Sequence, residues 1–159
     1  LVTASNVNRK AQAIKVAIDN LNFAIDSMVL NLQNGKLYHC INSSINDSNP
    51  WDSGGEDYDA PRSCLNNTGQ AIAFHLGQCT PSTDCKQRIY RYHTDGINKS
   101  IQIWRAETPG FVDITAPEIV IDSFRVDVLG TKKNRVLLMI EGQVNDNFNT
   151  KFNLKTTIY

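Results

Sequence analysis

The chain has 159 residues and carries 16 basic and 16 acidic side chains, so its formal net charge is zero at pH 7. This length suits one domain with a substantial core, and the charge balance excludes a global electrostatic attraction to nucleic acid or to an acidic membrane surface. The longest apolar run, residues 136–140, is far shorter than the roughly 20 residues that a membrane-spanning helix needs. The sequence therefore predicts a single domain, residues 1–159, with no nucleic-acid partner.

Residues 7–34 form the longest segment with a single hydrophobic period. Apolar side chains recur there at alternating steps of four and three, which places them on one stripe of a helix. No Pro or Gly interrupts the pattern, and Gly35 follows it as a stop. The helix would run about 42 Å, which is longer than a small domain, so we expect one end to project. The stripe residues expected to pack on a sheet are Ile14, Ile18, Leu21, Ile25, Met28 and Leu32, with Val7 and Ala11 continuing the stripe toward the N-terminus.

A second, narrower apolar row lies on the opposite side of this helix. Val16, Phe23 and Leu30 recur there at seven-residue spacing. Scattered apolar side chains are normal on a protein surface, which is the simpler interpretation. The alternative is that the broad stripe packs on the chain's own domain and the narrow row packs on a partner.

Residues 41–69 are rich in Asn, Ser, Asp, Gly and Pro and predict a long loop. Loops of this length in a compact domain are usually functional or tethered. Its carboxylates are the one candidate metal site, because hard oxygen ligands on a loop suit Ca²⁺, although a solvated loop is the simpler interpretation. The candidate calcium ligands are Asp47, Asp52, Asp57 and Asp59, with Glu56 among them, and we expect no cofactor.

The four cysteines, Cys40, Cys64, Cys79 and Cys85, have spacings that fit no zinc-ligand pattern. An even count among polar loops indicates two disulfides in an oxidising compartment. Three pairings are possible, and we favour Cys79 with Cys85, closing a hairpin loop, and Cys40 with Cys64, pinning the long loop. Four reduced structural cysteines are the alternative.

From Ala71 onward the hydrophobic period changes to two, which predicts strands. A hairpin with a disulfide-closed tip and a third strand over 97–105 make a meander, and Pro109 to Pro117 read as a connection. A phase shift near Ser123 in the next strand suggests a bulge or a short helical turn. The predicted fold is α+β: a helix over 1–34, a loop over 41–69, and one antiparallel sheet over 71–159 laid on the helix stripe. Its last three strands are expected over 119–129, 135–144 and 151–159.

Catalytic motifs are not found in the sequence, which lacks the Walker, GxSxG, HExxH and GxGxxG patterns. His39, His75 and His93 stand apart and are expected to be structural or surface side chains. The sequence therefore favours a protein without enzymatic activity.

The order of these features resembles the bacterial type IV pilin-like proteins, especially minor pilins and type II secretion pseudopilins. The likeness rests on Tyr-His-Cys at 38–40 after the helix, Ile-Ala-Phe at 72–74, Tyr-Arg at 90–91, and Phe-Asn-Leu-Lys-Thr-Thr at 152–157. It covers nearly the whole chain and depends on the order of short motifs.

This resemblance implies a subunit made with a leader that a prepilin peptidase removes, followed by an apolar half-helix that anchors it in the inner membrane. The chain begins at Leu1 within a helical pattern, so we expect that half-helix to precede Leu1. The implied function is a non-enzymatic subunit of a type IV pilus or pseudopilus, in the periplasm or at the cell surface. Its partners would be other pilin or pseudopilin subunits, which Val16, Phe23 and Leu30 would face.

Two other functions remain open. A secreted, disulfide-bonded binding module or adhesin would recognise its ligand through the 41–69 loop, with Trp51 and Tyr58 as aromatic contacts. An enzyme would need His75, His93 and a loop carboxylate to meet in space.

Overall fold

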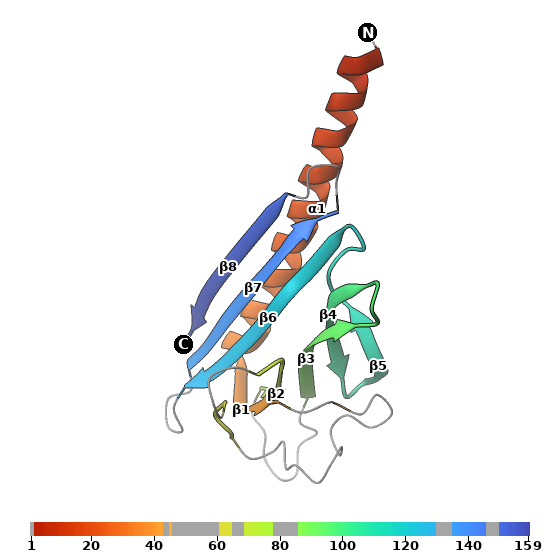
Figure 1. The fold of residues 1–159 in the computed structure, drawn as a ribbon. Coiled ribbons are helices and arrows are strands. Elements are labelled where there is room, and N and C mark those ends of the chain that lie inside the picture. The colour runs from red at the N-terminus through yellow and green to blue at the C-terminus, as the bar shows by residue number, and fades with distance from the viewer. Residues whose placement is uncertain are drawn as a thin grey trace.

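We describe a computed structural model of the chain, over residues 2–42, 45, 61–64, 69–77, 86–129, 135–145 and 150–159. Within these residues, one long helix is followed by eight strands (Figure 1). The elements are α1 (Val2–Gln33), β1 (Gly35–Ile41), β2 (Ala71–Leu76), β3 (Lys86–Thr94), β4 (Lys99–Arg105), β5 (Thr108–Asp113), β6 (Ile119–Leu129), β7 (Arg135–Val144) and β8 (Lys151–Ile158).

The strands form two antiparallel sheets. A five-stranded sheet has the order β1-β2-β3-β4-β5, and a three-stranded sheet has the order β6-β7-β8. Each follows chain order, as in a meander, so every neighbouring pair is also consecutive in sequence. The two sheets meet at an isolated bridge, where Gly69 N donates to Val126 O at 2.8 Å and Val126 N donates to Gly69 O at 2.9 Å.

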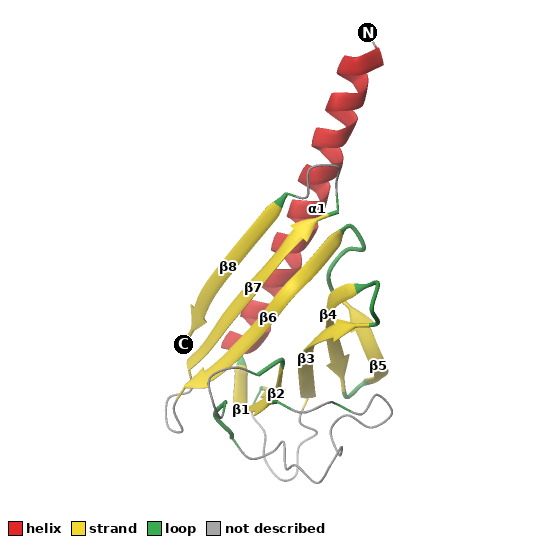
Figure 2. Ribbon diagram, in the orientation of Figure 1, coloured by secondary structure: helices red, strands yellow, loops and turns green. Residues whose placement is uncertain are grey.

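The predicted fold class, an α+β domain with one antiparallel sheet laid on the helix, is wrong. The described protein is mostly β (Figure 2), its strands divide between two sheets, and only part of α1 lies against them. The strands divide into two sheets because of the segment that follows β5. Ile114 N still donates to Ile101 O at 2.9 Å, but Ile119 N then donates to Ala116 O at 2.9 Å across a turn. This turn redirects the chain, so β6 packs across β4 and pairs with β7 rather than with β5.

Strand β5 was predicted as part of a connection because it contains Pro109 and Gly110. In the structure it is the last strand of the five-stranded order, where Trp104 pairs with Phe111 and Arg105 with Thr108. Proline is tolerated on such an edge strand because its missing N–H is not needed there. Gly110 has a φ of 96°, a left-handed value that a side chain would disfavour.

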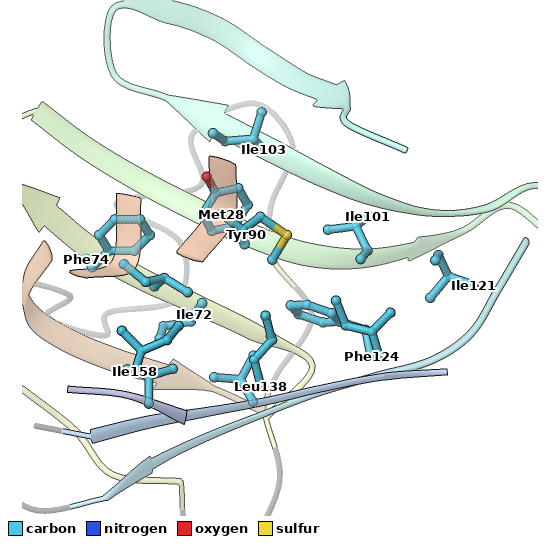
Figure 3. Close-up of a cluster of buried hydrophobic side chains, with 14 of the residues drawn as sticks. Met28, Ile72, Phe74, Tyr90, Ile101, Ile103, Ile121, Phe124, Leu138 and Ile158 are labelled. Carbon is cyan, nitrogen blue, oxygen red and sulfur yellow. The ribbon is translucent and has the colours of Figure 1, made fainter. Parts of the chain in front are cut away.

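The main core lies where the two sheets and the second half of α1 meet. Figure 3 shows Met28 of α1 among side chains of both sheets, including Tyr90 of β3 and Phe124 of β6. All three are at most 2% exposed, so each buries nearly its full apolar surface. A second, smaller cluster on the other face of the five-stranded sheet contains Ile41, Ala71, Ala73, Ile89 and Trp104.

The bulge suggested near Ser123 is confirmed. The β6–β7 register shifts between Ile121 and Ser123, so the extra residue is Asp122. Because of the shift, Ile121 before the bulge and Phe124 after it are both buried, while Asp122 is exposed and Ser123 is half-buried. The bulge therefore presents two consecutive polar side chains on the outer side of β6.

Candidate assembly surface

The second half of α1 is bound tightly to the rest of the protein. Its buried residues recur at steps of four and three, as expected for one helical face, and the helix contacts β1, β7 and β8. The buried set is Ala17, Leu21, Ala24, Met28 and Leu32, each at most 5% exposed.

The stripe predicted from the sequence is rotated about the helix axis relative to this buried face of α1. Leu21, Met28 and Leu32 are buried, and Ile25 is partly buried against the core. Ile14 is half-buried, and Ile18 is 37% exposed. Ala17 and Ala24 are buried although the predicted stripe does not include them, and their seven-residue separation places two small side chains on the face nearest the sheets. The signal was present in their spacing, but alanine is too weakly hydrophobic to mark a buried position by itself.

Two polar contacts fix the end of the helix. The single hydroxyl proton of Tyr38 is shared between the carbonyl of Leu32, in the last turn of α1, and the carbonyl of Gly35, whose oxygen lies 2.9 Å from Tyr38 Oη. Asn31 Nδ2 donates to Tyr90 Oη at 2.7 Å and ties α1 to β3. Burial raises the pKa of both tyrosines, so both hydroxyls remain protonated at neutral pH. These contacts set the direction in which the helix leaves the domain.

The first half of α1 projects beyond both sheets (Figure 1). From Val7 to Val16, every side chain is exposed except Ile14, which is half-buried. Val7 is 68% exposed and Ala11 is also exposed, so the N-terminal part of the predicted stripe has no sheet beneath it. The amphipathic stripe therefore continues past the sheets and is uncovered there.

The narrow row on the back of α1 is also exposed. Val16 is 58% exposed, Phe23 is 77% exposed and Leu30 is 59% exposed. Phe23 and Leu30 lie on the half of the helix that packs on the sheets, so they point away from the chain's own core. The projecting stripe and this row together are the candidate assembly surface.

The charges of the helix are divided along its length. In the described part of α1, the basic side chains Arg9, Lys10 and Lys15 lie in the first half, and the acidic Asp19 and Asp26 follow. None of these charges lies in the first or last turn of α1, where charged side chains interact with the helix macrodipole.

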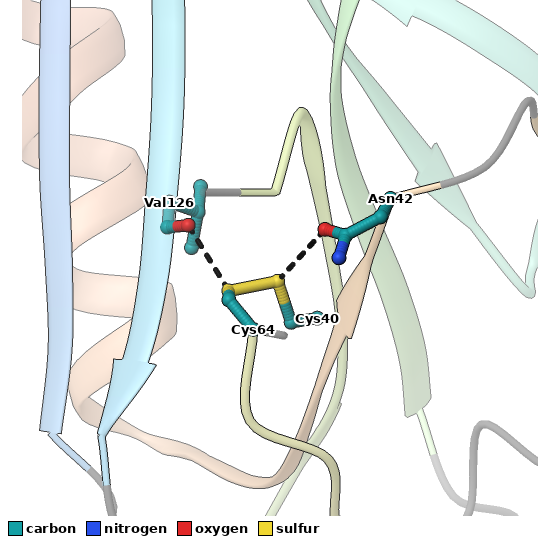
Figure 4. Close-up of a disulfide and its surroundings, with 4 residues drawn as sticks. All are labelled: Cys40, Asn42, Cys64 and Val126. Atoms are coloured by element: carbon teal, nitrogen blue, oxygen red, sulfur yellow. Dashed lines mark hydrogen bonds between the residues drawn. A yellow bond between two sulfur atoms is a disulfide. The ribbon is translucent and has the colours of Figure 1, made fainter. Parts of the chain in front are cut away.

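The favoured Cys40–Cys64 disulfide is present, with a Cα–Cα distance of 5.1 Å (Figure 4). Cys64 Sγ lies 3.1 Å from Val126 O, and Cys40 Sγ lies 3.6 Å from Asn42 Oδ1. Both are close contacts rather than true hydrogen bonds, because a disulfide sulfur carries no proton. The disulfide therefore joins β1 to the segment that passes beside β6.

Several other predicted site residues lie outside the described residues. These are Cys79 and Cys85, the candidate calcium ligands Asp47, Asp52, Asp57 and Asp59, and the loop aromatics Trp51 and Tyr58. In the part of the chain that the structure describes, no three His, Cys, Asp or Glu side chains come together as a possible metal site.

The three histidines lie on three different strands. His39 of β1 and His75 of β2 are each 3% exposed, and His93 is half-buried near the end of β3. In the β2–β3 register, His75 pairs with Gln87 and not with His93. The pairing of His75 with His93 that an enzyme would need is therefore not formed by these strands.

Comparison with known proteins gives no match: no family model, no curated protein and no solved structure is significantly similar to this chain. Among the described residues, no helix has the length and apolar character needed to cross a membrane.

Proposed function

We propose that this protein is a non-enzymatic structural subunit of a type IV pilus or type II secretion pseudopilus, and that it assembles through α1. The observation that carries the proposal is the helix itself, which is fixed to the core at one end and projects with an uncovered apolar stripe at the other. Exposed apolar surface on a rigid rod favours packing against similar rods.

The charge distribution on α1 supports assembly from like subunits. When two parallel helices are displaced along their axis, the basic first half of one lies beside the acidic second half of the other. Opposite charges then face each other, which favours this displaced packing of two helices. In this proposal, Val16, Phe23 and Leu30 pack on neighbouring helices, and the two sheets face outward.

The proposal places the subunit in the periplasm or at the cell surface, anchored in the inner membrane before assembly. It requires the gene to encode an apolar helical segment directly ahead of Leu1. A coding region that supplies no such segment would contradict it.

The experiment is to replace Phe23 with Asp in the full-length protein and to measure its incorporation into surface fibres. A buried carboxylate at a helix interface is costly, so we expect loss of incorporation with unchanged thermal unfolding of the subunit. The matched control is Asn22→Asp, which adds the same charge at an exposed position on the polar flank of the helix, away from the row. Normal incorporation of Phe23→Asp would show that the row is ordinary surface.

A further inference from the structure

A polar cleft lies at the junction of the two sheets, away from α1. Its volume is about 480 Å³, within the range of roughly 300–1,000 Å³ that is usual for small-ligand sites. It is lined by the residue that follows β1, by residues of β3 and β6, and by the segment before β2. The lining side chains that carry polar groups are Asn42, Gln70, Tyr92, Asp122, Ser123 and Arg125.

The walls of the cleft are held by covalent and backbone bonds. Tyr92 N donates to Gln70 O at 2.9 Å, and the paired bonds between Gly69 and Val126 lie directly beside it. The Cys40–Cys64 disulfide joins the C-terminal end of β1 to the same region (Figure 4). These bonds hold the backbone that carries the lining side chains, which lowers the entropy lost when a ligand binds.

The bulge in β6 gives the cleft its polar floor. Because Asp122 is the extra residue, it and Ser123 both face the cleft instead of alternating between the two sides of the sheet. Bulges often redirect side chains at binding sites. A regular strand here would remove one of these two groups from the cleft.

The lining chemistry restricts the kind of ligand. One carboxylate, on Asp122, and one guanidinium, on Arg125, leave the lining without net charge. Asp122 would repel an anion, and the guanidinium of Arg125 would repel a cation, so neither kind of ligand matches the lining well. The amides of Asn42 and Gln70 each offer both donors and acceptors, which suits a neutral ligand with many hydroxyl groups.

Tyr92 adds an aromatic surface and a hydroxyl donor. Its half-buried ring packs against the main core, which fixes the orientation of the side chain. Burial raises the pKa of the Tyr92 hydroxyl, and the negative charge of Asp122 raises it further. The hydroxyl is therefore protonated at neutral pH and can donate a hydrogen bond.

We propose that this cleft binds a neutral sugar unit of a glycan. Asp122 and the two amides hydrogen-bond adjacent sugar hydroxyls, Arg125 donates to a ring or glycosidic oxygen, and Tyr92 provides the aromatic edge. The site is separate from the assembly surface, so it holds whether or not α1 assembles into fibres.

The test uses the purified chain and an array of defined oligosaccharides ending in galactose, glucose, mannose or N-acetylated hexosamines, with sialylated glycans for comparison. We expect binding to at least one neutral glycan, and at least tenfold weaker binding for Asp122→Ala. The matched control is Asp127→Ala, a carboxylate on the same strand that does not line the cleft, and it should bind as the unaltered chain does.

A second variant, Tyr92→Phe, keeps the ring in the core and removes only the hydroxyl, so it preserves folding and should weaken binding severalfold. Thermal unfolding of each variant separates lost binding from lost structure. The proposal is overturned if no neutral glycan binds at millimolar concentration, if only sialylated glycans bind, or if Asp122→Ala and Asp127→Ala bind equally.

Discussion

At the scale of single residues, close approach between neighbouring strands makes some positions intolerant of even one added carbon. Gly142 of β7 pairs with Ile121 and with Phe152 of β8, and it is buried. A Cβ at this position would lie 2.4 Å from Val120 O and 2.6 Å from the Phe152 ring. The absence of a side chain here lets the aromatic ring cover the backbone of the central strand.

We therefore expect Gly142→Ala to lower the free energy of unfolding by about 1–3 kcal/mol, the usual cost of overpacking a core. Urea unfolding of the purified chain measures this. The neighbouring exposed substitution Glu141→Ala should change stability by less than about 0.5 kcal/mol. Equal stability of the two variants would show that the backbone at Val120 and the Phe152 ring both move aside without cost.

The Arg88–Glu107 ion pair predicts a specific pH dependence. Arg88 Nη1 lies 2.6 Å from Glu107 Oε2, and Arg88 Nη2 lies 3.0 Å from Oε1, so the pair is bidentate. Arg88 is buried, whereas the Glu107 side chain is 46% exposed. The hydrogen bond from Arg88 lowers the pKa of Glu107 below its usual value. The pair therefore stabilises the fold at pH values above the pKa that Glu107 has in the unfolded chain. This stabilisation is lost as the pH falls through the lower pKa that Glu107 has in the folded chain.

Between about pH 5 and pH 3, we expect the free energy of unfolding to fall less steeply in Glu107→Gln than in the unaltered chain. Because Glu107 is largely solvated, the difference at neutral pH should be only about 0.5–1 kcal/mol. Urea unfolding as a function of pH measures it, with the exposed Glu118→Gln as the control. The account of this pair fails if Glu107→Gln and Glu118→Gln give the same pH profile.

At the scale of elements, the Cys40–Cys64 disulfide closes a loop with a sequence separation of 24 residues. Chain-entropy reasoning assigns such a loop about 3.5 kcal/mol of stabilisation. We expect Cys40→Ala combined with Cys64→Ala to lower the free energy of unfolding by about that amount. Reduction of the unaltered chain should lower it by at least as much, because reduction would also open the predicted Cys79–Cys85 disulfide. A change below about 1 kcal/mol in both experiments would contradict the estimate.

Local patterns in the sequence predicted the individual helix and strands better than they predicted how the strands are arranged into sheets. The period of α1, the alternation in β7 and the irregularity near Ser123 are all set by side chains close together in sequence. The division into two sheets depends instead on the turn after β5, which strand alternation does not encode. The candidate assembly surface was visible as the Val16, Phe23 and Leu30 row, because seven-residue spacing is a local signal.

The polar cleft could not be predicted in the same way. Its residues come from four separate segments, and the bulge in β6 places Asp122 and Ser123 on the same side of the strand. The buried positions of Ala17 and Ala24 were missed for a related reason, since burial of a small side chain depends on what packs against it.

At the scale of the whole molecule, the divided charge of α1 predicts that assembly depends on electrostatics. Asp19→Lys with Asp26→Lys makes the helix basic throughout and should weaken assembly, most strongly at low salt. Adding Arg9→Glu and Lys15→Glu reverses the pattern and should restore it. All four side chains are exposed, so subunit folding should be unchanged. Fibre yield measures the effect, and a fourfold variant no better than the double variant would contradict it.

The most direct measurement replaces Phe23 with a photo-crosslinking phenylalanine derivative in the assembled full-length protein. If α1 packs on the helices of neighbouring subunits, illumination should join two subunits, and mass spectrometry should place the new bond on the helix of the second. The same derivative at Asp95, in the exposed turn after β3, serves as the comparison. Crosslinks confined to the subunit's own chain, or no crosslinks from position 23, would contradict the account.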